Sequence, residues 1–208
     1  MDSRRAESFS DGVFAVAITV LVFNLLPISD DTAGPRALTA GHLAGHWPAY
    51  LAYVVSFLTI GIMWLNHHGL FMRITRVDRP LLLLNMFLLM GIVAIPFPTA
   101  LVADHLNEGG GGKVAAVTYG LVMIAISVGY AVIWTYVTTH QRALGAQNMA
   151  LSRSSTLRFT AGNAGYVAGT LIGLVAPVAS LIIYGLLAIY YMFEHLPDPG
   201  GDNSRPGD

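Results

Sequence analysis

The sequence lacks cysteine altogether and is poor in charge. Without cysteine the chain forms no disulfide and offers neither a thiolate nucleophile nor a cysteine metal ligand. Only 11% of its 208 residues are charged and 54% are hydrophobic, whereas about 25% of the residues in an ordinary soluble domain are charged. The formal net charge of −1 gives no electrostatic basis for binding nucleic acid, so no nucleic-acid partner is expected. This composition is typical of an integral membrane protein.

The chain contains long runs without a charged residue. Polar or glycine-rich connectors separate five of them, at 12–29, 47–72, 81–103, 114–141 and 159–193. A transmembrane helix takes about 17–25 residues, so the last run is long enough to cross twice. Pro177 lies near its middle, and a proline there disfavours a continuous helix. We therefore predict an all-α, polytopic membrane protein with six transmembrane helices per subunit, the last two forming a hairpin.

The placement of basic residues predicts the orientation, because short loops rich in Lys and Arg stay in the cytoplasm. With the N-terminus inside, nine of the eleven Lys and Arg residues fall on the cytoplasmic side. Both termini of a multi-pass cell-membrane protein are then cytoplasmic. Residues 1–196 are expected to form one six-helix transmembrane domain, followed by a disordered cytoplasmic tail at 197–208 that is rich in Pro, Gly and Asp. The run from Gly109 to Gly112 is interpreted as a flexible outer turn.

The first apolar run carries small and polar residues on one side. At about 100° per residue, five side chains fall within about 40° of one direction, while Asp11 lies about 100° away; the five are Ser8, Gly12, Val16, Thr19 and Phe23. Such a face is typical of close helix packing, and it is also suited to lining a pore. The residue types alone leave both interpretations open.

Ionisable residues at the predicted cytoplasmic interface need partners, because a charge entering the bilayer is costly unless it is paired or hydrated. Asp11 is expected to pair with Arg5, His67 or His68, or to anchor the helix end as an interfacial ion pair. His67 and His68 are adjacent, so their side chains diverge by about 100° on a helix and cannot chelate one metal as residues four apart could. They are interpreted as interfacial hydrogen-bonding groups or as part of a polar network with Asp11, Arg5 or Asn85.

The start of the chain resembles the first helix of the transmembrane protein 175 family, the lysosomal potassium channel and its bacterial relatives. The resemblance rests on an R-x-x-x-F-S-D motif at Arg5, Phe9, Ser10 and Asp11, followed by the run G-V-F-A-V-A-I-T that ends at Thr19. It implies a homotetramer of six-helix subunits in the lipid bilayer, with a potassium pathway along the four first helices and no cofactor. Hydrophobic rings and a hydroxyl would then form the pore and gate, at Val16, Thr19, Val20 and Phe23. The motif residues Arg5, Phe9, Ser10 and Asp11 would hold the helices together.

A potassium-selective channel is accordingly the predicted function. The tetrapeptide Ser127-Val128-Gly129-Tyr130 is similar to part of a TVGYG potassium filter, but it lies inside an apolar run, whereas a filter needs non-helical backbone. The alternative is a proton- or cation-coupled transporter that uses Asp11 with His67 or His68, although inverted repeats are not visible. An enzyme is not expected, because neither a G-x-S-x-G nor an H-E-x-x-H pattern occurs.

Overall fold

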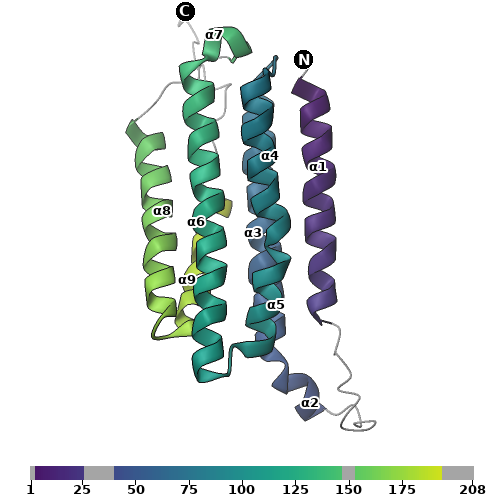
Figure 1. The fold of residues 1–208 in the computed structure, drawn as a ribbon, viewed down its shortest axis with the longest axis vertical. Coiled ribbons are helices and arrows are strands. Elements are labelled where there is room, and N and C mark those ends of the chain that lie inside the picture. Colours follow the sequence, from purple (N-terminus) through teal and green to yellow (C-terminus); the bar gives the residue numbers. More distant parts are fainter. Residues whose placement is uncertain (1–2, 26–39, 147–152, 194–208) are drawn as a thin grey trace, which may run out of the picture.

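The protein is a bundle of long helices that run side by side, seen in a computed structural model (Figure 1). The structure describes residues 3–25, 40–146 and 153–193. Within these ranges it contains helices and no strand, as the all-α prediction requires. The elements are α1 (Ser3–Val20), the 3₁₀ segment η1 (Leu21–Leu25), α2 (Ala40–Gly45), α3 (Trp47–Phe71), α4 (Arg79–Ala94), α5 (Pro96–His105), α6 (Gly109–Thr139), α7 (Gln141–Leu144), α8 (Arg153–Gly173) and α9 (Pro177–Phe193).

Four helical segments of the described chain are long and apolar enough to cross a membrane: Ser3–Leu25, Trp47–Phe71, Arg79–His105 and Gly109–Thr139. Helix α9 is apolar but has only 17 residues, and α8 pairs with it as a hairpin. The chain reverses between them at residues 174–176, and Pro177 takes the first position of α9. A proline is tolerated there because the first helical N–H needs no partner within the helix. The membrane-protein fold is thus confirmed, while the count of six spans stays a prediction. The predicted tail at 197–208 lies outside the described residues.

The described connectors lie at the two ends of the bundle. The start of α1, the connector between α3 and α4, and α7 all lie at one end (Figure 1). Backbone hydrogen bonds join two of these segments, because the N–H groups of Thr75 and Arg76 donate to the carbonyl oxygen of Leu144 at 3.2 and 3.0 Å. We call this the arginine end, since Arg76, Arg79 and Arg142 lie there and are exposed.

The glycine run is helical, so the expectation of a flexible turn was wrong. Helix α6 begins at Gly109. Gly112 is buried, and a Cβ added to it would lie 2.6 Å from the carbonyl oxygen of Leu106. Glycine is needed there because the start of α6 approaches the backbone at the end of α5 too closely for any side chain.

Buried hydroxyl groups connect the middle of the bundle. Ser56 Oγ of α3 lies 2.7 Å from Thr99 Oγ1 of α5 and 3.0 Å from the Tyr119 hydroxyl of α6. On the other side of α6, Thr170 Oγ1 of α8 lies 3.1 Å from the Tyr184 hydroxyl of α9. These contacts satisfy polar groups that would otherwise be buried in an apolar environment, and they fix the helices relative to one another.

Asp78 begins α4 and ties it to α6 at the arginine end. Its Oδ1 accepts from the Leu81 N–H at 3.0 Å, which caps the helix, and its Oδ2 accepts from the Tyr136 hydroxyl at 2.6 Å. Desolvation tends to raise the pKa of this carboxyl group, but the hydrogen bonds from Tyr136 and Leu81 outweigh it and hold the pKa below its usual value. A lowered native pKa means that the ionised carboxylate stabilises the fold above about pH 4 and that this stabilisation is lost as the pH falls.

We therefore expect Asp78→Ala to lower stability at neutral pH by about 1 kcal/mol, the usual value of an N-cap. Thermal unfolding of the purified protein at pH 7 and at about pH 2, below the lowered pKa of Asp78, measures this effect. The difference between wild type and variant should shrink at the lower pH, because the wild-type carboxylate becomes protonated. Asp104→Ala, at an exposed position near the opposite end, is the control and should be close to neutral. An equal loss at both pH values would show that the charge of Asp78 does not contribute.

Candidate functional site

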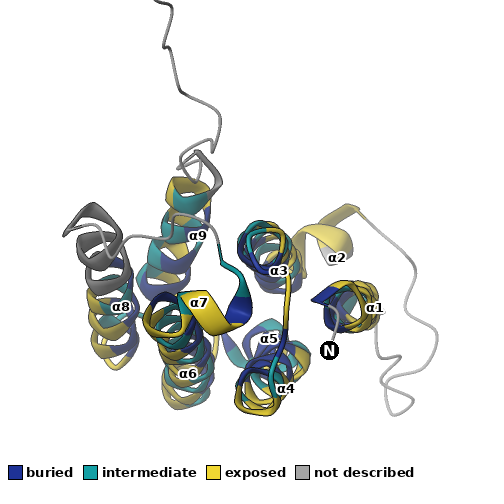
Figure 2. Cartoon of the chain, turned by 90° about the horizontal axis from the view of Figure 1, so that it is seen from above, coloured by how far each residue is buried: buried dark blue, intermediate teal, exposed yellow. Residues whose placement is uncertain are grey.

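Helix α1 stands at one edge of the bundle and has two distinct faces. One face is buried against α3 and α4 (Figure 2). This buried face comprises Ser3, Ala6, Ser10, Phe14 and Ala17. Their spacing of three and four residues is that of one stripe along a helix. The opposite face is turned away from α3 and α4, although the helix is apolar enough to cross a membrane.

The residues assigned to the pore by the sequence resemblance all lie on this outward face. Val16 is 58% exposed, Phe23 63% and Val20 38%, and Thr19 is exposed between them. Thr19 Oγ1 donates its hydrogen to the Val16 carbonyl oxygen of the same helix at 2.9 Å. The hydroxyl hydrogen is thereby occupied while the oxygen keeps lone pairs. The outward face therefore offers an oxygen ligand between hydrophobic side chains.

A chain of buried hydrogen bonds fixes α1 to the two helices behind it. Ser10 Oγ donates to the Ala6 carbonyl oxygen at 2.9 Å and accepts from Asn85 Nδ2 of α4 at 2.9 Å. Asn85 Oδ1 lies 2.8 Å from His67 Nε2 of α3. Because that amide oxygen can only accept, Nε2 carries the hydrogen in this arrangement. The three side chains are at most 2% exposed, so they form a buried link between α1, α4 and α3.

The imidazole ring of His67 makes aromatic contacts in addition to its hydrogen bond with Asn85. Its ring stacks on Phe71 at 4.3 Å and contacts Phe14 of α1 at 5.4 Å. The imidazole thus fills the space between α1 and α3 as an aromatic group, and its orientation is determined by packing.

Asp11 pairs with a tryptophan. Its Oδ1 accepts from Trp64 Nε1 of α3 at 2.9 Å. The expected partners were Arg5, His67 and His68, but a carboxylate near the membrane interface is also satisfied by an indole N–H. Arg5 and Phe9 are exposed on the outward side of α1, and Phe9 is 60% exposed. Within this subunit, Ser10 and Asp11 therefore contact the neighbouring helices, while Arg5 and Phe9 point away from them.

A second carboxylate of α1 faces the second histidine. His68 Nδ1 lies 2.8 Å from Glu7 Oε1, with side chains 44% and 15% exposed. His68 also stacks on Trp64 at 5.8 Å. The adjacent histidines therefore have different partners on different faces, as two neighbours on a helix must.

Sequence reasoning missed Trp64 and Glu7. A usable signal was present, because Trp64, His67, His68 and Phe71 follow the spacing of three and four residues that places side chains on one side of a helix. That stripe is the face of α3 that receives α1. In the part of the chain that the structure describes, no group of three His, Asp or Glu side chains could hold a metal. The filter-like tetrapeptide 127–130 lies within α6.

Comparison with known proteins gives concordant matches. The family model described as endosomal/lysosomal potassium channel TMEM175 matches residues 5–96. A potassium channel of Streptomyces collinus is 41% identical over 207 residues, which are 99% of this chain and 98% of that protein. The crystal structure of a lysosomal potassium-selective channel TMEM175 homolog from Chamaesiphon minutus superposes with a TM-score of 0.77 at 32% identity, covering 91% of this chain and 96% of that one. The endosomal/lysosomal proton channel TMEM175 of Gallus gallus is 30% identical over 149 residues, which are 68% of this chain and 29% of that protein.

Proposed function

Because this chain belongs to the TMEM175 family, we propose that it is a potassium-selective channel whose first helix lines the ion pathway. One observation carries the proposal: α1 presents an exposed face that holds Val16, Thr19, Val20 and Phe23 on a membrane-length helix at the edge of the bundle. The relatives at 41% and 32% identity, which are potassium channels, support potassium as the permeant ion.

A helix at the edge of one subunit lines a pathway only where several copies meet. We propose a homotetramer in which four α1 helices surround the axis and their outward faces become the pore wall. Lipid would gain little from contact with the hydroxyls of Ser8 and Thr19 or from the absent side chain of Gly12, whereas a water-filled pathway suits such groups. Such a tetramer repeats one heterologous contact four times and closes into a ring.

Within such a ring the four side chains have different tasks. Rings of Val16, Val20 and Phe23 obstruct ions by dewetting unless the helices move apart. Thr19 supplies the oxygen that can replace part of the hydration shell of potassium. The Ser10, Asn85 and His67 link and the Asp11 contact to Trp64 keep α1 in register behind the pore.

The arginine end is proposed to face the cytoplasm of a cell-membrane protein, with both termini on that side. The support is electrostatic, because eight of the eleven Lys and Arg residues belong to described segments that reach this end. Positively charged loops are retained on the cytoplasmic side during insertion.

Thr19→Val is expected to reduce the preference for potassium over sodium, since it keeps the shape of the side chain and deletes its oxygen. Reversal potentials of the reconstituted channel, with potassium on one side and sodium on the other, measure this. Each tenfold loss in the permeability ratio moves the reversal potential by about 59 mV. Phe23→Ala is expected to raise the current of larger cations by widening the ring that these side chains form in the proposed tetramer.

Matched controls lie on other helices. Thr118→Val on α6 removes a hydroxyl that is likewise bonded to its own helix, at 2.8 Å to the Val114 carbonyl oxygen. Phe87→Ala on α4 removes an aromatic ring that is 67% exposed. Both should leave reversal potentials unchanged. If Thr19→Val and Phe23→Ala behave like these controls in assembled protein, α1 does not line the pathway. A potassium current that needs an opposing proton gradient would instead indicate a coupled transporter.

A further inference from the structure

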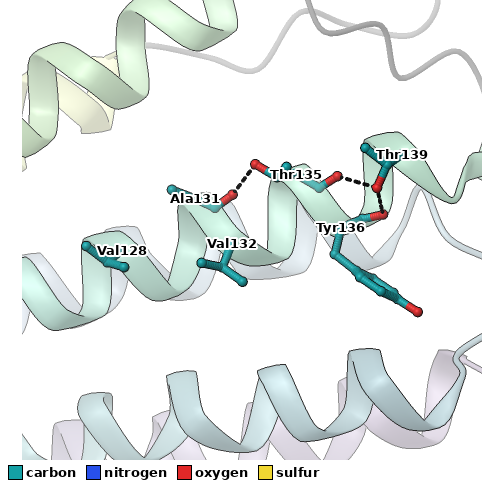
Figure 3. A pocket seen from close by; sticks show the side chains of 6 residues that line it. All are labelled: Val128, Ala131, Val132, Thr135, Tyr136 and Thr139. Atoms are coloured by element: carbon teal, nitrogen blue, oxygen red, sulfur yellow. Dashed lines mark hydrogen bonds between the residues drawn. The ribbon is translucent and has the colours of Figure 1, made fainter.

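A groove follows the outer surface of α6 near the arginine end of the bundle (Figure 3). It is shallow and open to the surroundings, with a volume of about 420 Å³. All of its lining residues belong to α6 and recur every three or four positions, namely Val128, Ala131, Val132, Thr135, Tyr136 and Thr139.

The groove is apolar despite its two threonines. Thr135 Oγ1 donates to the Ala131 carbonyl oxygen at 2.7 Å, and Thr139 Oγ1 donates to the Thr135 carbonyl oxygen at 2.9 Å. Both hydroxyl hydrogens are thus occupied by the helix itself (Figure 3). Val128 and Val132 are 48% and 43% exposed. An occupant of the groove is therefore recognised by apolar contact along its length.

The length of the groove matches one leaflet of a bilayer. From Val128 to Thr139 the helix rises about 16 Å, at about 1.5 Å per residue. The hydrocarbon core of a bilayer is about 30 Å thick, so the groove runs from the interface to about the midplane. It is suited to an extended acyl chain.

Three arginines belong to segments at the arginine end of the bundle, where the groove also ends. Tyr136, which lines the groove, donates to Asp78 at 2.6 Å, and Asp78 directly precedes Arg79. The Arg76 N–H bonds to Leu144 at 3.0 Å, beside Arg142 of α7. The three guanidinium groups are exposed. The carboxylate among them, Asp78, already accepts from Tyr136 and Leu81.

We propose that this groove and its arginines bind an anionic phospholipid. The acyl chain lies along α6 from Val128 to Thr139, and the phosphate lies between Arg79, Arg142 and Arg76. Charge complementarity selects the anionic headgroup, because a guanidinium group binds phosphate oxygens through paired N–H donors. The groove distinguishes a lipid from free phosphate, which has no apolar part to fill it. This site is separate from the outward face of α1, on which the proposed channel function rests.

The test measures lipid retained by the assembled, full-length protein. Delipidated protein in detergent is titrated with dioleoylphosphatidylglycerol or dioleoylphosphatidylcholine, and bound lipid is counted by native mass spectrometry. Arg142→Gln and Arg79→Gln should each weaken phosphatidylglycerol binding roughly fivefold, and together about 25-fold. Lys113→Gln at the opposite end of α6 is the charge control and should have no effect. Val132→Trp should fill the groove and abolish retention, whereas Leu121→Trp, at a position of α6 that is 58% exposed, should not.

Four results would overturn the proposal. These are equal retention of the two lipids, equal retention by Val132→Trp and Leu121→Trp, displacement of the lipid by inorganic phosphate alone, and loss of assembly with Val132→Trp but not with Leu121→Trp. The last would mean that a second copy of the chain covers the groove. If Val132→Trp does not fold, Ala131→Leu fills the same groove with less bulk and should lower retention in a folded protein.

Discussion

Replacing Gly120 by alanine is expected to push α6 away from α8 and α9 and to destabilise the fold by about 3 kcal/mol. Gly120 is buried, and a Cβ added to it would collide with the oxygens of both Thr170 and Tyr184. Overpacking of a well-packed core costs about 1–3 kcal/mol. Here two atoms must move and their 3.1 Å hydrogen bond must break. The gain in helix propensity from glycine to alanine, about 1 kcal/mol, does not offset this cost. Thermal unfolding of the purified protein measures the change.

Two companion variants make this prediction specific. Gly61→Ala on α3 adds the same methyl group where no atom lies within 4 Å, so it should be neutral or slightly stabilising. Combining Gly120→Ala with Thr170→Ala and Tyr184→Phe removes both colliding oxygens and should recover part of the lost stability. If the triple variant is less stable than Gly120→Ala alone, the contact with these oxygens is not the cause.

Replacing Asn85 by leucine is expected to cost about 2–3 kcal/mol and to loosen the attachment of α1. The amide is the middle of the buried link. Its loss leaves the Nε2–H of His67 without an acceptor, and Ser10 Oγ loses the hydrogen bond that it accepts from Asn85 Nδ2. An unsatisfied buried polar group costs about 1–3 kcal/mol, and interhelical hydrogen bonds within membranes average about 0.6 kcal/mol. The measurements are the unfolding temperature and the yield of assembled protein.

A double variant separates the hydrogen bond from packing. His67→Phe combined with Asn85→Leu replaces both polar partners by apolar groups, an exchange that is often close to neutral. A phenylalanine also retains the stacking with Phe71. The double variant should therefore be more stable than Asn85→Leu alone. Asn24→Leu, which removes a single 3.3 Å hydrogen bond to Pro96, should cost less than Asn85→Leu. The opposite order in either comparison would contradict the role given to the link.

The membrane fold and the reversal at Pro177 were accessible from the sequence because both depend on local properties. Apolar length determines which segments can span a bilayer, and proline acts on its own backbone and on the preceding residue. The outward orientation of Val16, Thr19 and Phe23 also follows from a periodicity that one helix carries within itself.

The partners of these residues were less accessible, because they depend on how helices meet. A basic partner was expected for Asp11, whereas in the structure its carboxylate accepts a hydrogen bond from the indole of Trp64. The glycine run at 109–112 is typical of a turn when considered locally, but the backbone of Leu106 makes it part of a tightly packed helix start. Asp11 and Trp64 are 53 residues apart in the sequence and meet only in the fold. The close approach of Gly112 to Leu106 depends on how the chain turns between α5 and α6, which the residue types do not specify.

The 3₁₀ form of Leu21–Leu25 has a geometric consequence for the end of the first membrane segment. A 3₁₀ helix turns about 120° and rises about 2.0 Å per residue, against about 100° and 1.5 Å in an α-helix. The same five residues wound as an α-helix would be about 2.5 Å shorter and would be turned back by about 100°. The length of this segment and the rotation of its side chains about the helix axis therefore change together. A change of winding confined to these residues would swing the ring of Phe23 around the helix axis while Thr19, one turn earlier, stayed in place.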